Sequence, residues 1–121
     1  MKFRLLLYVL HKKMAWAARK NPRFKKFIQD KQMKFAIKAG PNGAGRYFVF
    51  DSGQISSSSK KIDACDAAMV WSDAETAFKV MASGNDEASV AALTEKKLKV
   101  EGDLKAFMWF SRAVDIMMGK A

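Results

Sequence analysis

Cysteine, histidine and proline are scarce in this sequence. Its 121 residues include one cysteine, Cys65, one histidine, His11, and two prolines. A single cysteine cannot form an internal disulfide, and one cysteine with one histidine cannot supply the ligands of a zinc site. His11 lies in a basic segment without a neighbouring carboxylate, so we predict a surface-facing side chain rather than a catalytic one. The sequence therefore predicts no enzyme, no metal site and no cofactor.

Long apolar runs are missing as well. Residues 5–10 form an apolar run far shorter than the roughly 20 residues that a membrane-spanning helix requires. A secretory signal peptide also fits poorly, because Lys12 and Lys13 follow the run where a small-residue cleavage site belongs. Together with the single cysteine, these features predict a cytoplasmic protein, with peripheral membrane association as an open alternative.

Acidic residues are almost absent from the first third of the chain. Residues 1–38 contain twelve lysines or arginines and one acid, Asp30, for a net charge of +11, whereas residues 39–121 carry a net charge of −1. Such a concentration of charge points to a local anionic partner. We expect an anionic membrane surface, contacted through residues 1–26, and consider nucleic acid the weaker alternative because basic patches serve either anion.

The first twenty residues read as one basic amphipathic helix. Apolar side chains recur at the helical spacing of three and four residues over residues 3–19. Three interpretations stay open: the helix lies on an anionic membrane, packs against the sheet of its own domain, or forms a homodimer contact. In the first case, the membrane contacts would be Phe3, Leu6, Leu7, Leu10, Lys12, Lys13, Trp16 and Arg19. We therefore separate residues 1–20 from a domain at residues 21–121.

Short strands and helices alternate in the remainder of the chain. Asn21 and Pro22 begin a second helix as its N-cap and first residue. Residues 40–45 and 51–54 predict turns between strands, and the pattern Ser72-Asp73-Ala74-Glu75 predicts a capping box. Strands are expected at residues 34–38, 46–50, 55–59, 64–71 and 97–101, and helices after Ser72, near Asp86 and after Asp103. This order predicts a single α+β domain with a mainly antiparallel sheet of about five strands and helices over one face.

The last segment, residues 97–118, combines a strand, a corner and a long helix. Leu98 and Val100 alternate with charged residues, and Gly102 ends the strand before Asp103, which is suited to cap the helix. The helix carries methionine and aromatic side chains where a core helix more often has leucine, isoleucine and valine. Since methionine adapts to varied apolar shapes, this face is either ordinary core or a surface that holds an apolar ligand.

Several segments together resemble the sterol carrier protein 2 family of lipid-binding domains. The resemblance rests on their order and spacing over residues 22–118. The segments are Phe-Ala-Ile-Lys at 35–38, Arg-Tyr-Phe-Val-Phe-Asp-Ser-Gly at 46–53, Val-Trp-Ser at 70–72, Ser-Gly at 83–84 and Lys-Leu-Lys-Val-Glu-Gly-Asp at 97–103. One departure is that Glu95 and Lys96 precede the Lys-Leu-Lys strand, where the family often has glycine.

The resemblance implies a non-enzymatic protein that binds a sterol, fatty acyl chain, phospholipid or polyprenyl lipid in an apolar tunnel. Residues 21–121 would form the lipid-binding domain, with the tunnel between the sheet and the last helix. Its expected lining residues are Phe48, Phe50, Val70, Phe78, Met81, Leu93, Phe107, Met108, Phe110, Val114, Met117 and Met118. Bacterial relatives that assist ubiquinone assembly suggest an alternative role, as an interaction partner or accessory factor in a lipid-biosynthesis complex.

Overall fold

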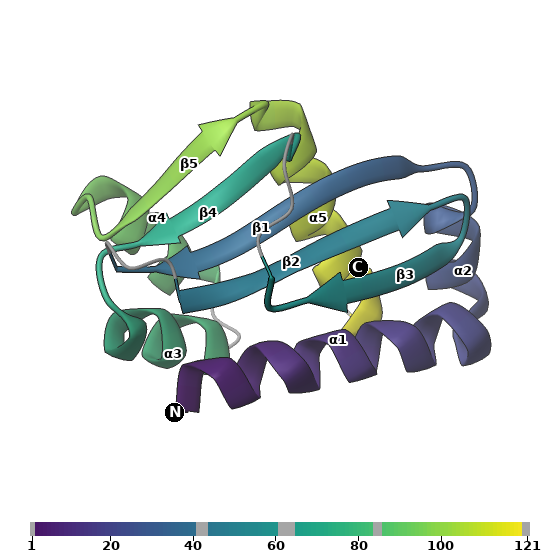
Figure 1. Ribbon diagram of the computed structural model, residues 1–121, viewed down its shortest axis with the longest axis horizontal. Helices are drawn as coiled ribbons and strands as arrows, with labels where there is room; N and C mark the ends of the chain where they lie inside the picture. Colours follow the sequence, from purple (N-terminus) through teal and green to yellow (C-terminus); the bar gives the residue numbers. More distant parts are fainter. Residues whose placement is uncertain (1, 41–43, 61–64, 84–85, 120–121) are drawn as a thin grey trace.

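A computed structural model describes residues 2–40, 44–60, 65–83 and 86–119. Within these residues, five strands form one sheet, and α1 and α5 pack on one of its faces (Figure 1). The helices are α1 (Lys2–Lys20), α2 (Pro22–Ile28), α3 (Ala74–Ser83), α4 (Asp86–Thr94) and α5 (Leu104–Met117). The strands are β1 (Gln32–Ala39), β2 (Ala44–Asp51), β3 (Gln54–Ser58), β4 (Ala67–Trp71) and β5 (Leu98–Gly102). The predicted α+β class is confirmed.

The sheet has the strand order β3-β2-β1-β4-β5. Only the pairing of β1 with β4 is parallel, and the pairings β1–β2, β2–β3 and β4–β5 are antiparallel. β1 lies in the centre of the sheet. Its consecutive residues Phe35, Ala36 and Ile37 are all buried: Phe35 and Ile37 belong to the main core, and Ala36 packs with Tyr47 and Ala68 on the opposite face. The predicted mainly antiparallel sheet is thus confirmed, with one parallel pairing in its middle.

β4 begins at Ala67, three residues later than predicted. Residue 64 lies outside the described residues, and Cys65 and Asp66 precede the strand. The carboxylate of Asp66 accepts a hydrogen bond from the backbone N–H of Lys34 at 2.7 Å. The backbone N–H of Asp66 in turn donates to the carbonyl oxygen of Lys34 at 2.8 Å, so Asp66 joins the end of β4 to β1 through both its backbone and its side chain. Of the predicted turn at residues 40–45, residues 41–43 likewise lie outside the described part.

The corner between β5 and α5 forms as the sequence predicts. Gly102 has a φ of +85°, and a Cβ atom there would collide with the backbone carbonyl of Asp66, so only glycine fits. Asp103 then caps α5, because its Oδ1 accepts a hydrogen bond from the backbone N–H of Lys105 at 2.9 Å. Asn21 caps α2 in the same manner through the backbone N–H groups of Arg23 and Phe24.

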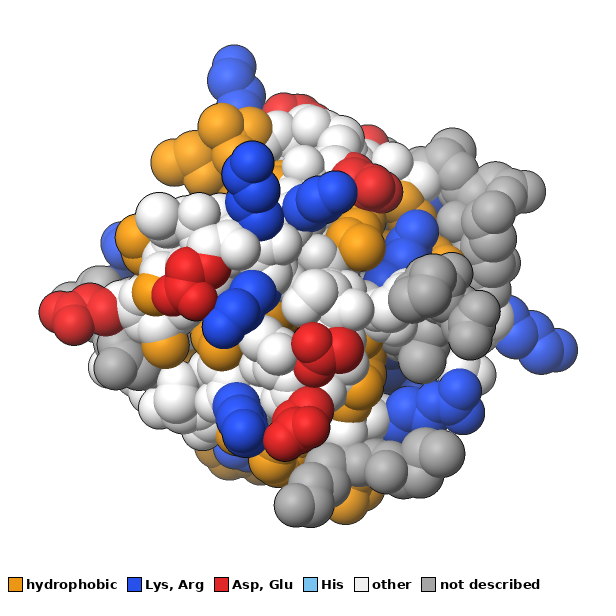
Figure 2. Space-filling model, turned by 90° about the vertical axis from the view of Figure 1, so that its left-hand side faces the viewer, with side chains coloured by type: hydrophobic (Ala, Val, Ile, Leu, Met, Phe, Trp, Pro, Cys, Tyr) orange, Lys and Arg blue, Asp and Glu red, His pale blue; other side chains and the backbone are white. Residues whose placement is uncertain are grey.

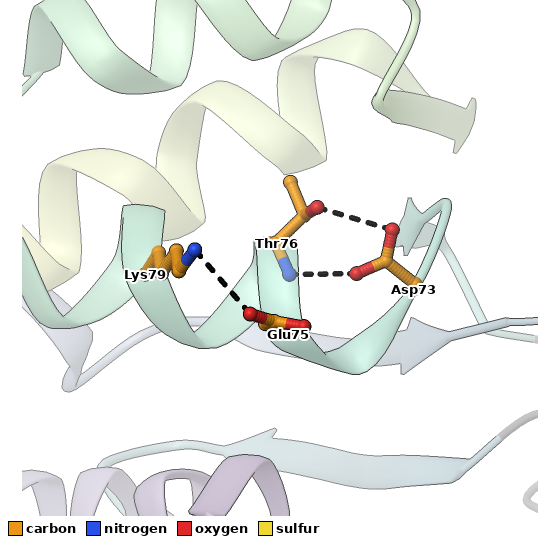
Figure 3. Close-up of polar contacts among 4 residues, drawn as sticks. All are labelled: Asp73, Glu75, Thr76 and Lys79. Atoms are coloured by element: carbon orange, nitrogen blue, oxygen red, sulfur yellow. Dashed lines mark hydrogen bonds and ion pairs between the residues drawn. The ribbon is translucent and has the colours of Figure 1, made fainter.

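At the start of α3 the capping residue is Asp73, so the prediction of a Ser72–Glu75 capping box was off by one residue. The carboxylate of Asp73 accepts hydrogen bonds from the backbone N–H of Thr76 at 2.7 Å and from its hydroxyl at 3.1 Å (Figure 3). These bonds, the backbone bond first, hold the pKa of the Asp73 carboxyl below its ordinary value. Glu75 instead pairs with Lys79 at 3.3 Å across one turn.

An aromatic cluster fixes α5 to the sheet. The ring of Phe110 stacks on Phe35 with centroids 4.1 Å apart and also contacts Phe48 and Phe50. Trp109, on the next position of α5, meets Phe50 edge-on at 5.0 Å. Close aromatic packing of this kind fills the space between the first turns of α5 and the sheet, where the tunnel was expected.

Candidate functional site

The functional-site candidate is a pocket enclosed by α1, α3 and α5. Its volume is about 240 Å³, and it is partly open to solvent. Apolar side chains dominate its lining. The lining residues are Leu6, Val9, Leu10, Lys13, Met69, Val80, Met81, Ala82, Ser89, Phe110, Ser111, Val114, Asp115, Met117 and Met118. Ligand pockets combine an apolar lining with a few polar groups in this way.

Helical periodicity explains how α1 and α5 present their sides of the pocket. In α1, Leu6, Leu10 and Lys13 follow one another at spacings of four and three residues, which places them on one side of the helix. In α5, Phe110, Val114 and Met117 repeat the same spacing. The two helices therefore face each other across the pocket along one and a half to two turns each.

Four methionines, Met69, Met81, Met117 and Met118, contribute to the lining. They come from β4, α3 and the end of α5, so that three of the elements around the pocket each contribute a flexible thioether side chain. Methionine has three rotatable bonds and a polarisable sulfur, and it adjusts to irregular apolar partners. The pocket can consequently change its shape at low energetic cost.

The pocket also contains charged and hydroxyl groups. Lys13 and Asp115 lie on α1 and α5, and Ser89 and Ser111 add two hydroxyls. Within the part of the chain that the structure describes, neither Lys13 nor Asp115 takes part in an ion pair. These groups can therefore orient the polar end of a bound molecule, while the apolar lining contacts its remainder.

The predicted lining residues divide into two groups. Five of them lie in the pocket: Met81, Phe110, Val114, Met117 and Met118. Phe48 and Phe50 belong to the packed core beneath α5, and Phe107 on α5 is half-buried against that core. Phe78 lies half-buried on α3 outside the pocket. Leu93 and Met108 are exposed at the surface, Met108 to 61%.

Val70 points to the opposite face of the sheet. There it packs with Ala36, Tyr47 and Ala68 in a small second cluster, while its neighbour Met69 faces the pocket. Because side chains alternate along a strand, Met69 and Val70 cannot share a face. Sequence reasoning placed Val70 in the tunnel and missed Met69, although the alternation with Trp71 in the core would have identified it.

The contribution of α1 to the pocket was also missed. Sequence reasoning assigned Leu6 and Leu10 to membrane contact, whereas they line the pocket together with Val9 and Lys13. Phe3 and Leu7, also predicted to contact a membrane, lie in the core with Met14 and Ala17. The spacing of these apolar residues correctly predicted an amphipathic helix. The structure shows that the apolar face of α1 packs inside the domain.

The outer side of α1 remains exposed to solvent. Lys12, Trp16 and Arg19 lie there, and Leu5 is exposed to 63%. Lys13 is exposed as well, but on the side of α1 that lines the pocket. No helix in the described ranges is long and apolar enough to cross a membrane. Figure 2 shows that the end of the molecule formed by the left-hand side of Figure 1 has acidic and basic side chains intermixed, in contrast to the almost acid-free sequence of α1 and α2.

His11 is not surface-facing, contrary to the prediction. Its side chain is half-buried, and its Nδ1 atom is buried without a hydrogen-bond partner among the residues that the structure describes. Burial lowers the pKa of His11, and the positive charges of Arg46 and Lys12 lower it further. The imidazole is therefore kept neutral more strongly than an exposed histidine would be.

No protein-family model and no curated protein matches this sequence. The fold, in contrast, matches solved structures of sterol carrier protein 2 domains. A structure described as UbiJ-SCP2, a ubiquinone synthesis protein, superposes with a TM-score of 0.71 at 14% identity, over 93% of this chain and 96% of that chain. The sterol carrier protein domain 2 of Helicoverpa armigera gives a TM-score of 0.67 at 15% identity, over 99% and 91% of the two chains.

These matches show that the chain has the sterol carrier protein 2 fold, which the sequence resemblance predicted. A further match is to part of an enzyme, the inverting sec-alkylsulfatase Pisa1 from Pseudomonas sp., with a TM-score of 0.54 at 12% identity. That match covers 74% of this chain but only 13% of the sulfatase chain. The likeness is thus to one small portion of a much longer protein.

Proposed function

We propose that this protein is a non-enzymatic lipid-binding domain that holds a long apolar molecule in the pocket between α1, α3 and α5. The observation that carries the proposal is the pocket itself, with its apolar, methionine-rich lining. The sterol carrier protein 2 fold supports it, because the similar structures include sterol carrier proteins. The ligand class comprises sterols, fatty acyl chains, phospholipids and polyprenyl lipids.

Burial of apolar surface supplies the binding energy. Each methylene group that leaves water contributes about 0.8 kcal/mol. The pocket volume of about 240 Å³ lies somewhat below the roughly 300–1,000 Å³ that is common for sites of drug-sized ligands. A bound lipid would therefore place only part of its apolar portion in the pocket as it stands, or widen the pocket by moving the methionines.

A substitution that fills the pocket tests this proposal. Val114 is half-buried in the pocket wall, and Val114→Trp would occupy the volume that a ligand needs. Displacing two methylenes of a ligand already costs about 1.6 kcal/mol, so we expect affinity for a fluorescent fatty acyl probe to fall about tenfold or more.

The matched control is Met108→Trp, on the same helix but exposed to 61% and outside the pocket. We expect this variant to bind the probe as the unsubstituted protein does. Equal affinity of both variants, or no uptake of acyl probes by the unsubstituted protein, would contradict the proposal. Circular dichroism of the Val114→Trp variant distinguishes a filled pocket from a lost fold, because overpacking costs about 1–3 kcal/mol.

The second candidate function is that of an accessory factor that binds a protein partner in a lipid-biosynthesis complex. Leu104 and Met108 favour it, since they lie one turn apart on α5 and are exposed to 60% and 61%. The similarity to the ubiquinone synthesis protein is a further reason. Co-precipitation of a protein partner, measured before and after removal of bound lipid, separates partner binding from lipid carriage. The control is the double variant Leu104→Gln/Met108→Gln.

Peripheral contact with an anionic membrane is part of the lipid-carrier proposal. The exposed side chains on the outer side of α1, among them Lys12, Trp16 and Arg19, provide positive charge and an amphipathic ring. The contact would be confined to this outer side, because Phe3 and Leu7 are in the core. Co-sedimentation with vesicles that weakens as salt is raised would support it, and salt-independent recovery in the supernatant would refute it.

A further inference from the structure

A group of basic side chains surrounds Tyr8 where α1 faces β2 and β3. The guanidinium carbon of Arg46 lies 5.4 Å from the centre of the Tyr8 ring, and the Nζ atom of Lys12 lies 5.4 Å from the same centre. Both distances are within the range of cation–π contacts. Tyr8, His11, Lys12 and Arg46 are not among the lining residues of the pocket. The group is thus a separate feature of the surface, built by two elements.

Arg46 is held in a fixed position. Its Nε–H donates a hydrogen bond to the hydroxyl of Ser57 on β3 at 2.7 Å, and its side chain is half-buried. The Nε–H is one of five N–H donors of a guanidinium group. Among the residues that the structure describes, no partner is seen for the other four donors. Arg46 therefore offers a preorganised fork of donors at a defined place.

His11 adds an unsatisfied nitrogen to the same place. Its Nδ1 is buried, and no described residue forms a hydrogen bond with it. Buried polar atoms in folded proteins almost always have a partner, so such an atom calls for an explanation. After burial, the positive charges of Arg46 and Lys12 lower the pKa of His11, because both cations lie near the imidazole.

Acidic side chains that could balance these charges are missing from the surrounding elements. α1 and β3 contain no aspartate or glutamate, and Asp51, the one acid of β2, contacts Gln32 at the far end of the strand. In residues 2–40, 44–60, 65–83 and 86–119, no carboxylate lies within ion-pair distance of Arg46 or Lys12. Neighbouring cations without a counter-charge attract anions from solution.

We propose that Arg46, Lys12 and His11 form a binding site for a phosphate-type anion. The planar fork of arginine matches two oxygens of a phosphate, lysine adds a point charge, and the imidazole adds a further positive charge once it is protonated. A bound dianion stabilises the charged imidazole, so that binding and protonation of His11 reinforce each other. The anion is either a soluble phosphate ester or the phosphate of a lipid headgroup, and the site does not depend on occupation of the apolar pocket.

His11 reports on this site without ambiguity, because it is the only histidine of the chain. The full-length protein is titrated with inorganic phosphate while the imidazole Cε1–H resonance is followed by NMR, against chloride at equal ionic strength. We expect a saturable shift with phosphate alone. At saturation the pKa of His11 should be higher than in chloride by about one unit, which corresponds to about tenfold tighter binding to the protonated protein.

Three single substitutions localise the site. Arg46→Gln and Lys12→Gln should each weaken phosphate binding about tenfold, as expected for the loss of a charge-assisted hydrogen bond. Lys20→Gln removes the same charge from the exposed end of α1 and should leave the affinity unchanged. Since Lys12 is exposed, Lys12→Gln keeps the test valid even if Arg46→Gln unfolds the protein.

Vesicles distinguish the two sources of phosphate. Phosphatidic acid presents a phosphate monoester, and phosphatidylglycerol at equal surface charge presents a diester. If phosphatidic acid vesicles shift the His11 resonance and retain the unsubstituted protein but not the Arg46→Gln variant, the anion is a lipid headgroup. If only inorganic phosphate gives the saturable response, the ligand is a soluble ester. The proposal is overturned if neither anion gives a saturable response, or if Lys12→Gln and Lys20→Gln reduce it equally.

Discussion

His11 has two positive neighbours and a buried nitrogen, and this environment makes the stability of the protein depend on pH. The pKa of His11 is lowered by burial first and by Arg46 and Lys12 next. The unfolded chain, with a pKa near the ordinary 6.5, therefore takes up a proton at a higher pH than the folded protein does. Stability from this group is fully present above that ordinary value and is lost as pH falls through the lower, folded-state pKa.

We accordingly predict that in chloride buffer the free energy of unfolding falls between pH 7.5 and pH 5. Urea unfolding at several pH values measures it. His11→Gln, which cannot be protonated, should remove most of the slope in this window, because the carboxylates titrate at lower pH. An unchanged slope in the His11→Gln variant would show that His11 is not the group responsible.

The sequence predicted helix starts correctly where a single residue decides the cap. Asn21 and Asp103 cap their helices as expected, since a cap depends only on the next two or three residues. The start of α3 was more difficult, because Ser72 and Asp73 are both good caps, and the choice depends on where the preceding strand ends. The burial of His11 could not be predicted from its neighbours in the sequence, because Arg46, which lies near it, comes from a strand more than thirty residues later.

Among the elements, α1 shows how one apolar stripe can serve several purposes. Phe3, Leu7, Met14 and Ala17 belong to the core, whereas Leu6 and Leu10 line the pocket. Periodicity predicts that a helix has an apolar side, but it does not say whether a sheet, a lipid or a membrane covers that side. The interpretation that α1 packs against its own domain is the one that the burial of Phe3 and Leu7 supports.

Two leucines on α1 give a matched test of this packing. Leu7 is exposed to 1% and Leu5 to 63%. We expect Leu7→Ala to lower the free energy of unfolding by about 2–5 kcal/mol, the range for a leucine truncated in a core. Leu5→Ala should change it by no more than about 0.5 kcal/mol, as for most surface substitutions. Chemical denaturation measures both, and equal effects would mean that α1 is not packed as described.

The packing of the aromatic cluster under α5 could not be predicted from the sequence. Phe48, Phe50 and Phe110 were all expected to line a tunnel, and the rings of Phe48 and Phe50 on the sheet contact the ring of Phe110 on α5. Whether such side chains leave a cavity or fill it depends on how closely the rings approach. Phe110 stacks on Phe35 at 4.1 Å, so this part of the interface is packed solid.

In the whole molecule, the pocket is a product of the complete chain. Its walls come from α1 near the start, from β4, α3 and α4 in the middle, and from α5 at the end. The order of strands and helices, together with the resemblance of the segments at 35–53 and 97–103, was sufficient to predict the fold. The position of the pocket was not predictable from these local patterns, because residues as distant as Leu6 and Val114 become neighbours only in the folded protein.

The most direct measurement of the central claim is an NMR titration of methionine methyl groups with a long-chain fatty acid. The eight methionines include four in the pocket, Met69, Met81, Met117 and Met118. Met14 and Met33 are buried in the core, and Met108 is exposed on α5. The account predicts saturable shifts of the four pocket methyls and little change at the other three sites. Saturable binding that shifts Met108 while the four pocket methyls stay unchanged, or no binding at all, would contradict it.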